Sequence, residues 1–238
     1  MDTLYIVMPA YNEEANIEQV VRAWYPLLEG RGTDSRLVVA DSGSTDRTDG
    51  ILKELQRSMP QLEILSDTEK QHGPKVLALY RYAIEKNADY VFQTDSDGQT
   101  DPGEFAAFWN RRHDADGIFG YRSKRGDGLS RAFVEKVVCF LLWWFFRVRV
   151  PDANAPFRMM RAGVLSRYID KIPEDYALPN IMLTAWFVHA RERVQFREIS
   201  FRPRQGGTNS IDIRRIAGIG WQALKDFREF RKQMAGGR

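Results

Sequence analysis

The first 120 residues alternate short apolar runs with longer segments whose apolar residues recur at every third or fourth position. The runs have the length of buried strands, and the longer segments have the period of amphipathic helices. This alternation predicts a mostly parallel sheet with helices on both faces. The predicted strands are residues 4–8, 37–40, 62–65, 90–94 and 117–120, separated by helices at 17–28, around 51–55, at 76–84 and from 101 onward. Beyond residue 120, we expect helices at 131–149, 178–190 and 211–231 and a strand at 194–201.

Length and cysteine content narrow the architecture. A chain of 238 residues is long enough for one large α/β domain. We place that domain at residues 1–210 and a basic amphipathic helix at 211–238. The single cysteine, Cys139, cannot form an intramolecular disulfide and favours a reducing, cytoplasmic compartment. We expect no cleavable signal, because Asp2 is acidic and the apolar run at 4–8 is short.

Polar clusters directly follow three of the predicted strands. They are residues 9–14, 41–46 and 95–99. Ligands of parallel sheets gather at the carboxyl ends of the strands, so we expect these clusters to meet at one edge. Helix capping is the alternative explanation, and Ser44 and Thr45 occupy positions suited to it.

Asp95 and Asp97 are the first charged residues after the predicted strand at 90–94. Two carboxylates one residue apart offer hard oxygen ligands for Mg²⁺ or Mn²⁺, and such a metal often binds substrate phosphates as well. A solvated acidic turn is the alternative, since Asp and Gly favour loops. The other polar clusters favour the metal site.

Together, these motifs resemble those of the family 2 glycosyltransferases with the GT-A fold, most closely the dolichyl- or polyprenyl-phosphate sugar synthases. The resemblance runs from about residue 4 to residue 210 and rests on residues 8–14, 41–46 and 95–99. It implies a Rossmann-like sheet and a metal-dependent transfer of a hexose from a UDP- or GDP-sugar to polyprenyl phosphate. A nicotinamide dehydrogenase is not expected, because no Gly-x-Gly-x-x-Gly follows the first strand.

The resemblance also implies roles for single residues. Asp95 would lie beside the sugar or ribose, and Asp97 and Gln99 would hold the divalent metal on the diphosphate. The residues expected around the nucleoside are Pro9, Tyr11, Glu13 and Asp41.

Residues 202–210 resemble the Arg-x-x-Gly-x-Ser element of the same family. Arg202, Arg204 and Ser210 are therefore candidates for binding phosphate, and the two arginines would hold the acceptor phosphate. A basic loop that precedes a helix is the alternative.

Two departures from the family pattern concern the site. Ser42 stands where members usually have a second acidic residue. Many members that act on hydroxyls carry an acidic base on the helix that starts here at residues 178–180, whereas the nearest carboxylates are Glu174 and Asp175. An alcohol acceptor needs a general base, but a phosphate monoester is already ionised, so the missing base fits a phosphate acceptor.

Two other functions stay open. A soluble transferase that acts on a sugar or protein hydroxyl would use Asp175 or Glu174 as its base. A non-catalytic subunit that binds nucleotide or docks on a membrane would also lack the base.

Two segments favour a membrane surface as a partner. Residues 137–146 are apolar on every side of a helix and lead into Arg147 and Arg149, a composition typical of the headgroup region. Residues 202–238 hold nine Lys or Arg against three acidic residues, which suits an anionic surface. The alternatives are a buried core helix and a packed terminal helix with a solvated basic face. We therefore expect peripheral attachment at the cytoplasmic face of a membrane, no transmembrane helix and no nucleic-acid partner.

Lysine and histidine residues carry weaker signals. Lys75 begins a predicted helix and could meet a phosphate there, but exposure to solvent is the more common fate of a lysine and is expected. His113 and His189 have no metal-ligand spacing and receive no role.

Overall fold

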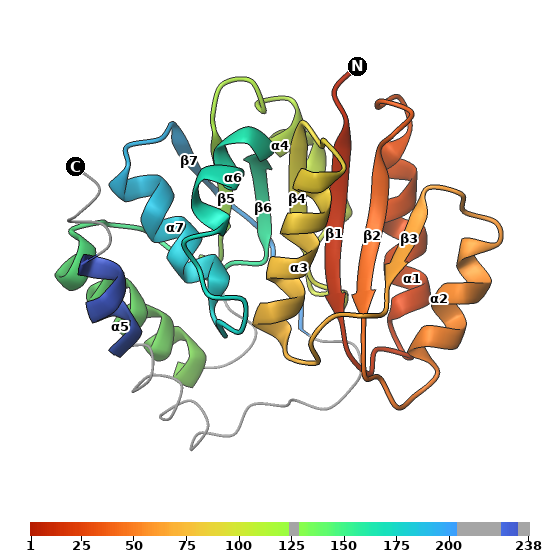
Figure 1. The fold of residues 1–238 in the computed structure, drawn as a ribbon, viewed down its shortest axis with the longest axis horizontal. Helices are drawn as coiled ribbons and strands as arrows, with labels where there is room; N and C mark the ends of the chain where they lie inside the picture. Colours follow the sequence, from red (N-terminus) through yellow and green to blue (C-terminus); the bar gives the residue numbers. More distant parts are fainter. Residues whose placement is uncertain (124–128, 204–224, 233–238) are drawn as a thin grey trace.

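A mixed β-sheet organises the chain, as Figure 1 shows. The computed structural model describes residues 1–123, 129–203 and 225–232. Within these ranges the sheet has seven strands in the order β3-β2-β1-β4-β6-β5-β7. The strands are β1 Leu4–Ala10, β2 Arg36–Asp41, β3 Leu62–Leu65, β4 Tyr90–Thr94, β5 Gly117–Tyr121, β6 Phe157–Arg161 and β7 Val194–Glu198. The α-helices are α1 Ile17–Trp24, α2 Thr48–Gln56, α3 His72–Glu85, α4 Phe105–Trp109, α5 Leu129–Phe146, α6 Ala162–Ile169 and α7 Pro179–His189, with 3₁₀-helices η1 Tyr25–Leu28 and η2 Pro102–Glu104.

The strands of the amino-terminal half are parallel. β1 pairs in parallel with β2 and β4, and β2 pairs in parallel with β3. β5 and β7 also pair in parallel, whereas β6 runs antiparallel to both β4 and β5. The predicted α/β fold with a mostly parallel sheet is confirmed.

β6 and α6 are not among the elements expected from the sequence. The β6 sequence, Phe-Arg-Met-Met-Arg, contains two arginines that interrupt its apolar pattern. Arg158 is nevertheless 1% exposed, because its guanidinium hydrogen-bonds to carbonyls and a hydroxyl inside the protein. A buried arginine of this kind leaves no signal in the hydrophobic pattern of a strand.

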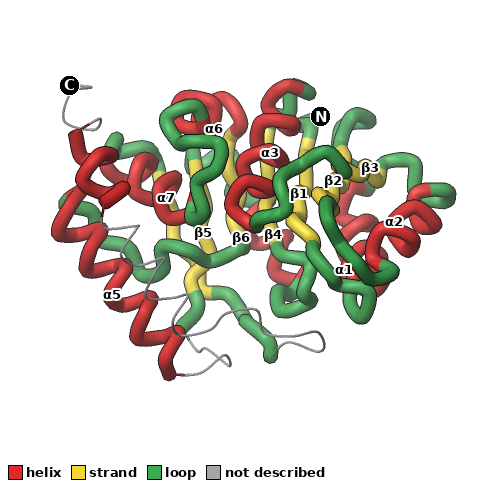
Figure 2. Tube along the Cα trace, turned by 60° about the horizontal axis from the view of Figure 1, so that its bottom comes forward, coloured by secondary structure: helices red, strands yellow, loops and turns green. Residues whose placement is uncertain are grey.

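Helices cover both faces of the sheet because the strand residues alternate. Tyr5 and Val7 of β1 belong to the core beneath α3, α6 and α7. Leu4, Ile6 and Met8 point the other way, into the core beneath α1, α2 and α4. Figure 2 shows α3 on one side of the strands and α1 and α2 on the other. Both cores consist of buried aliphatic and aromatic side chains.

The long apolar helix α5 packs on α7 with only part of its surface. Leu142 and Phe146 are buried, while Phe140 and Trp144 are more than half exposed. Residues 225–232 form a helical segment whose Phe227 contacts Phe146, with ring centroids 5.4 Å apart. The described part of the expected terminal helix therefore packs on the body through its apolar face. No helix among the described residues combines the length and apolarity needed to cross a bilayer.

Candidate active site

The loops that follow β1, β2 and β4 meet at the carboxyl edge of the sheet. β1 lies between β2 and β4 and runs parallel to both, so the three strands end side by side. The Ser96 hydroxyl donates to the Pro9 carbonyl at 2.8 Å, and the Asn12 N–H donates to Ser44 Oγ at 3.0 Å. The predicted meeting of the polar clusters at one edge is confirmed.

The loop after β1 directs Tyr11 outward and Glu13 inward. Tyr11 is 38% exposed, and Lys70 Nζ lies 5.0 Å from the centroid of its ring. Glu13 is buried, and its Oε2 accepts a hydrogen bond from Asn16 Nδ2 at 3.0 Å. The Glu13 N–H donates to Thr48 Oγ1 at 2.8 Å, which ties this loop to the start of α2. Tyr11 thus presents an aromatic ring at the surface, and Glu13 holds the loop that carries it.

Asp41 ends β2 and is 4% exposed. Burial raises the pKa of Asp41, although the hydrogen bond that Ser44 Oγ donates at 2.5 Å opposes the rise. The prediction that Ser44 and Thr45 cap the next helix is wrong. Asp46 Oδ1 instead accepts the N–H of Thr48, the first residue of α2, at 3.0 Å. Ser44 is therefore part of the site edge.

Lys75 of α3 lies beneath the ends of β1 and β2. Its side chain is 1% exposed, so the prediction of an exposed lysine is wrong. Its ammonium donates to the Ala10 carbonyl at 2.5 Å and to the Ser42 carbonyl at 3.0 Å. Burial lowers the pKa of Lys75 to about 8. This lysine joins the two strand ends that carry the first two polar clusters.

The loop after β4 holds its acidic residues in a tight turn. Asp97 Oδ1 accepts the N–H of Gln99 at 3.1 Å. Gly98 between them has a φ of +73°, a conformation that side chains with a Cβ rarely adopt. The hydroxyls of Thr94 and Thr100 lie 2.7 Å apart and close the base of the loop. The turn therefore fixes the backbone around Asp97.

Asp95 contacts two side chains on the same carboxylate oxygen. Gln93 Nε2 donates to Asp95 Oδ1 at 3.2 Å, and His72 Nε2 lies 3.4 Å from that oxygen. The His72 side chain is more than half exposed, and the hydrogen bond and charge of Asp95 raise its pKa. The sequence carries no signal for this pair, because 23 positions separate the two residues and only the fold brings them together.

Arg202 lies beside Gln99 after the last strand. Gln99 Nε2 donates to the Arg202 carbonyl at 2.8 Å, and the Arg202 N–H donates to the Gln99 carbonyl at 2.8 Å. The Arg202 guanidinium pairs with Asp101 at 2.6 Å and stays half exposed. Arg204 and Ser210, the other predicted phosphate ligands, lie outside the described residues. Arg202 is thus brought to the edge that carries Asp95 and Asp97.

Residues 5–172 match the model of a protein family described as glycosyl transferase family 2. The match covers well over half of the chain. The chain belongs to glycosyl transferase family 2. The prediction of a glycosyltransferase is confirmed at the level of the family.

Named relatives of this glycosyltransferase differ in their acceptors. Glucosyl-3-phosphoglycerate synthase of Mycobacterium tuberculosis is 36% identical over 96 residues, which span 40% of this chain and 29% of that protein. UDP-N-acetylglucosamine–dolichyl-phosphate N-acetylglucosaminyltransferase of Methanococcus voltae is 30% identical over 116 residues, 43% of this chain and 44% of that protein. The matched part covers less than half of either relative, so their names do not decide the subgroup.

Solved structures support the fold. The crystal structure of glucosyl-3-phosphoglycerate synthase from Mycobacterium tuberculosis in complex with Mn²⁺, UDP and glucosyl-3-phosphoglycerate has a TM-score of 0.69 to this chain, at 19% identity. The similarity covers 97% of this chain and 80% of the other. At this identity the likeness establishes the fold and no more.

The residues of the β4 loop fit a divalent metal that is shared with a substrate. Among the described residues, no group of three or more His, Cys, Asp or Glu side chains could hold a metal ion. Mg²⁺ is commonly held by one or two carboxylates together with substrate phosphates and water, and Asp95 and Asp97 offer that number from one loop. Because Gln99 Nε2 donates to Arg202, only its Oε1 is suited to a metal.

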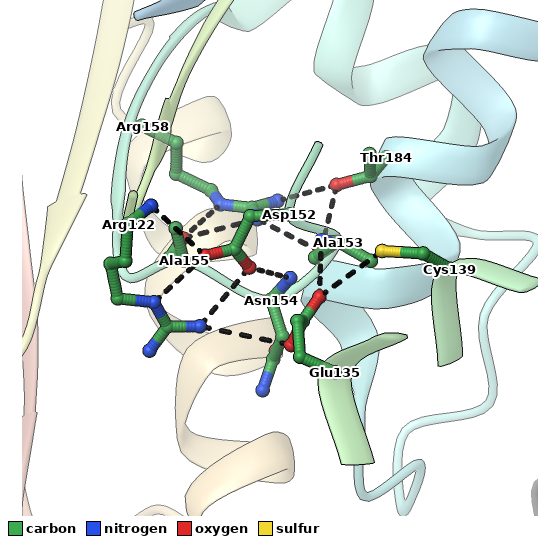
Figure 3. A network of polar contacts seen from close by, with 9 residues as sticks. All are labelled: Arg122, Glu135, Cys139, Asp152, Ala153, Asn154, Ala155, Arg158 and Thr184. Carbon is green, nitrogen blue, oxygen red and sulfur yellow. Dashed lines mark hydrogen bonds and ion pairs between the residues drawn. The ribbon is translucent and has the colours of Figure 1, made fainter. Parts of the chain in front are cut away.

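A second polar network holds α5 beside the same edge (Figure 3). Arg122, just after β5, donates to both carboxylate oxygens of Asp152, at 2.8 and 3.0 Å. Glu135 of α5 accepts the N–H of Ala153 at 2.7 Å. Burial and the charge of Asp152 raise the pKa of Glu135. The loop before β6, the end of β5 and α5 are therefore locked together.

The start of α7, the place at which we look for a base in the sequence, is buried. Asn180 is 3% exposed, and its side chain bonds to Gln93 and Tyr80 inside the protein. Glu174 and Asp175 are exposed, and Glu174 lies 3.4 Å from Arg81. The missing carboxylate at the helix start therefore does not by itself indicate which acceptor is used.

Proposed function

We propose that the chain is a metal-dependent, inverting glycosyltransferase that moves a hexose from a UDP- or GDP-sugar to a polyprenyl phosphate. The observation that carries the proposal is the joining of three strand-end loops at one edge. The Ser96–Pro9 and Asn12–Ser44 hydrogen bonds connect these loops. They bring an exposed aromatic ring, a buried carboxylate and the Asp95–Asp97 pair to one region, as a nucleoside diphosphate sugar requires.

In this proposal the three loops contact different parts of the donor. Tyr11 offers its exposed ring to the base, and Pro9, Glu13 and Asp41 shape the surrounding nucleoside pocket. Asp95 orients the sugar or ribose. Asp97, with Gln99 Oε1, would hold Mg²⁺ or Mn²⁺, which when bound neutralises the charge that develops on the leaving diphosphate.

In the reaction itself, the acceptor phosphate replaces the nucleoside diphosphate on the sugar. An oxygen of the acceptor phosphate attacks the anomeric carbon, and the bond from that carbon to the nucleoside diphosphate breaks, so the configuration inverts. The phosphate oxygen is already ionised and needs no base. Arg202, half exposed beside the β4 loop, would hold the acceptor phosphate together with Arg204.

The names of two relatives support a lipid acceptor. One is the dolichyl-phosphate transferase of Methanococcus voltae, and another is an undecaprenyl-phosphate transferase of Pseudomonas aeruginosa that is 25% identical over 169 residues. Such an acceptor places the enzyme at the cytoplasmic face of a membrane.

An exposed apolar face on α5 supports a membrane as the partner. Val137, Phe140 and Trp144 are 39%, 56% and 55% exposed and follow each other at helical spacing; we call them the α5 face. Exposed basic side chains lie nearby in the chain at Lys136, Arg147 and Arg149. Aromatic side chains beside cations suit the headgroup region of an anionic bilayer.

A soluble phosphorylated acceptor is the second candidate. The 36% identity with a glucosyl-3-phosphoglycerate synthase over 96 residues favours it. Both candidates place an acceptor phosphate within reach of Arg202, and they differ in whether a lipid is required.

The experiment that separates them is a donor and acceptor panel. Purified protein with Mn²⁺ or Mg²⁺ is given UDP- and GDP-sugars, with polyprenyl phosphate, with 3-phosphoglycerate or with neither. Release of nucleoside diphosphate that requires one donor and the lipid is the expected result. Release with 3-phosphoglycerate alone supports the second candidate. Metal-dependent nucleotide binding without release from any pair contradicts catalysis and indicates a nucleotide-binding subunit.

A further inference from the structure

A chain of side-chain hydrogen bonds inside the protein ends on Asp95. Gln93 of β4 is fully buried, and its Nε2 donates to Asp95 Oδ1 at 3.2 Å. Gln93 Oε1 accepts from Asn180 Nδ2 at 3.0 Å. Asn180 Oδ1 in turn accepts from the Tyr80 hydroxyl at 2.9 Å. Three buried side chains from α3, α7 and β4 therefore connect to one oxygen of a site residue.

The donors and acceptors of this series of hydrogen bonds all point the same way, from Tyr80 to Asp95. Tyr80 has one hydroxyl proton, and burial raises the pKa of Tyr80, so the phenol remains a donor. The hydroxyl lies 2.9 Å from Asn180 Oδ1 and 3.5 Å from Gln93 Oε1, so it donates to the nearer Asn180 oxygen, and the Asn180 NH₂ faces Gln93. Gln93 must then present its carbonyl to Asn180 and its NH₂ to Asp95. Each of the three side chains thus donates to the next acceptor in the series, from Tyr80 to Asp95.

Arg158 holds the α7 end of this series of hydrogen bonds in place. It stands opposite Gln93 in the antiparallel β4–β6 pair, so both side chains lie on one face of the sheet. Its guanidinium donates to the Asn180 carbonyl at 3.1 Å and to Thr184 Oγ1 at 3.3 Å, and Figure 3 shows it between Thr184 and Ala155. The bonds to α7 hold the first turn of that helix, and with it Asn180, at a fixed place above β4.

We propose that Asn180 is a positioning residue for Asp95 and that it acts through Gln93. This inference rests on the proposed role of Asp95 at the donor. The position where relatives that act on hydroxyls carry a base is here part of the internal support of the donor site. Asn180 has no access to the acceptor, because its side chain is buried and both of its polar atoms are bonded.

Asn180→Asp should break this series of hydrogen bonds. The new side chain has the same shape, but as a carboxylate it has no hydrogen to give to Gln93 Oε1, and taking up a proton at pH about 8 to supply one costs free energy. If Gln93 turns its amide over to satisfy residue 180, its carbonyl then faces the carboxylate of Asp95. Either arrangement brings two acceptors together in a buried place, which is costly. The substitution should therefore damage the site and not create a base.

A thermal unfolding cycle tests the connection without any substrate. Asn180→Asp, Asp95→Asn and the double variant are compared with the parent chain at pH about 8, where a free carboxyl is ionised. In the double variant the hydrogen bonds can form in the opposite direction. The amide at position 95 can donate to the carbonyl of the turned Gln93, whose NH₂ then donates to the carboxylate at position 180. We expect the double variant to recover at least half of the loss in unfolding midpoint caused by Asn180→Asp alone. Additive losses would overturn the proposal, because the series connects residues 180 and 95 through Gln93.

A matched control and an activity measurement complete the test. Asn110→Asp makes the same chemical change at the exposed residue that directly follows α4, and its loss should add to that of Asp95→Asn. With the donor and acceptor found active in the panel, Asn180→Asp should lower kcat about tenfold or more while Asn110→Asp leaves it unchanged. Unchanged kcat for Asn180→Asp contradicts the positioning role. If no pair is active in the panel, the proposed function fails while the unfolding cycle still decides the connection.

Discussion

Single buried polar residues hold the site edge together, and Lys75 is the most constrained of them. Its ammonium has left water almost completely and donates to one carbonyl at each of two strand ends. Burial disfavours the charged form, which is why its pKa is lowered to about 8. The two hydrogen bonds join the loops that carry Tyr11 and Asp41, so the cost of burial supports the geometry of the site.

Lys75→Met should reveal this cost as a pH dependence. The folded-state pKa is about 8, below the usual value of 10.5, so between these values the unfolded chain binds more protons than the folded one. The contribution of Lys75 to stability therefore rises with pH across this window, by up to about 3 kcal/mol for a shift of this size.

The measurement is urea unfolding of the parent chain and Lys75→Met at several pH values from about 7 to about 10. We expect the free energy of unfolding of the parent to rise relative to the variant as the pH increases. Lys53→Met, which removes an exposed lysine from α2, is the control for losing a surface lysine. A parent-to-variant difference that stays flat or falls with pH contradicts the assignment.

The sequence predicts the residue types at this edge but not their burial or their partners. Asp41, Asp95 and Asp97 follow apolar runs, and this order alone places them at strand ends. Lys75 and His72 belong to α3, and their contacts depend on how that helix docks across the ends of β1, β2 and β4. A hydrogen bond between distant positions has no local pattern from which it could be predicted.

At the scale of elements, α5 differs from the other helices of the fold. Residues 137–146 are apolar on every side, a pattern that fits a core helix and a membrane-surface helix equally well. In the structure, one side of the helix packs on the body through Leu142 and Phe146, while the α5 face remains exposed. The Glu135–Ala153 hydrogen bond fixes the helix beside the carboxyl edge of the sheet.

Replacing Phe140 and Trp144 of the α5 face with Ser together should weaken binding to anionic vesicles. Removing two large aromatic side chains from the headgroup region should lower the partition coefficient about tenfold or more. The measurement is co-sedimentation with vesicles of phosphatidylglycerol and phosphatidylcholine in equal amounts, at low and high salt.

Tyr11→Ser is the matched control, because it removes an exposed aromatic side chain from another part of the surface. Equal binding by the parent and the double variant contradicts the role of the α5 face. A change in oligomeric state on substitution, without a change in vesicle binding, would assign the face to a second copy of the chain.

Elements with a simple period are predicted best. The strands that became β1 to β5 and the helices α1 to α3, α5 and α7 all follow runs or repeats visible in the sequence. β6 is missed because Arg158 and Arg161 interrupt it, and its antiparallel direction depends on the chain returning between β4 and β5. That return is what sets Arg158 opposite Gln93 and completes the support beneath Asp95.

At the scale of the whole molecule, we assign the donor and the acceptor to different halves of the sheet. The parallel strands β1, β2 and β4 carry the donor loops, and in our proposal Arg202, which follows β7, serves the acceptor phosphate while the α5 face serves the membrane. Arg202 joins the halves, because its backbone bonds to Gln99 while its guanidinium remains half exposed. The family assignment and the fold apply to the whole arrangement, and the chemistry depends most directly on Asp97.

The most direct test of the account is the rate of nucleoside diphosphate release by Asp97→Asn at saturating Mn²⁺, with the donor and acceptor found active in the panel. Asparagine keeps the oxygen that accepts the Gln99 N–H, so folding should be unchanged, and Asp49→Asn at a partly exposed position serves as the matched control. We expect about a 100-fold or greater loss for Asp97→Asn, an unchanged unfolding midpoint and full activity for Asp49→Asn. Full activity of Asp97→Asn at saturating metal would contradict the proposed site.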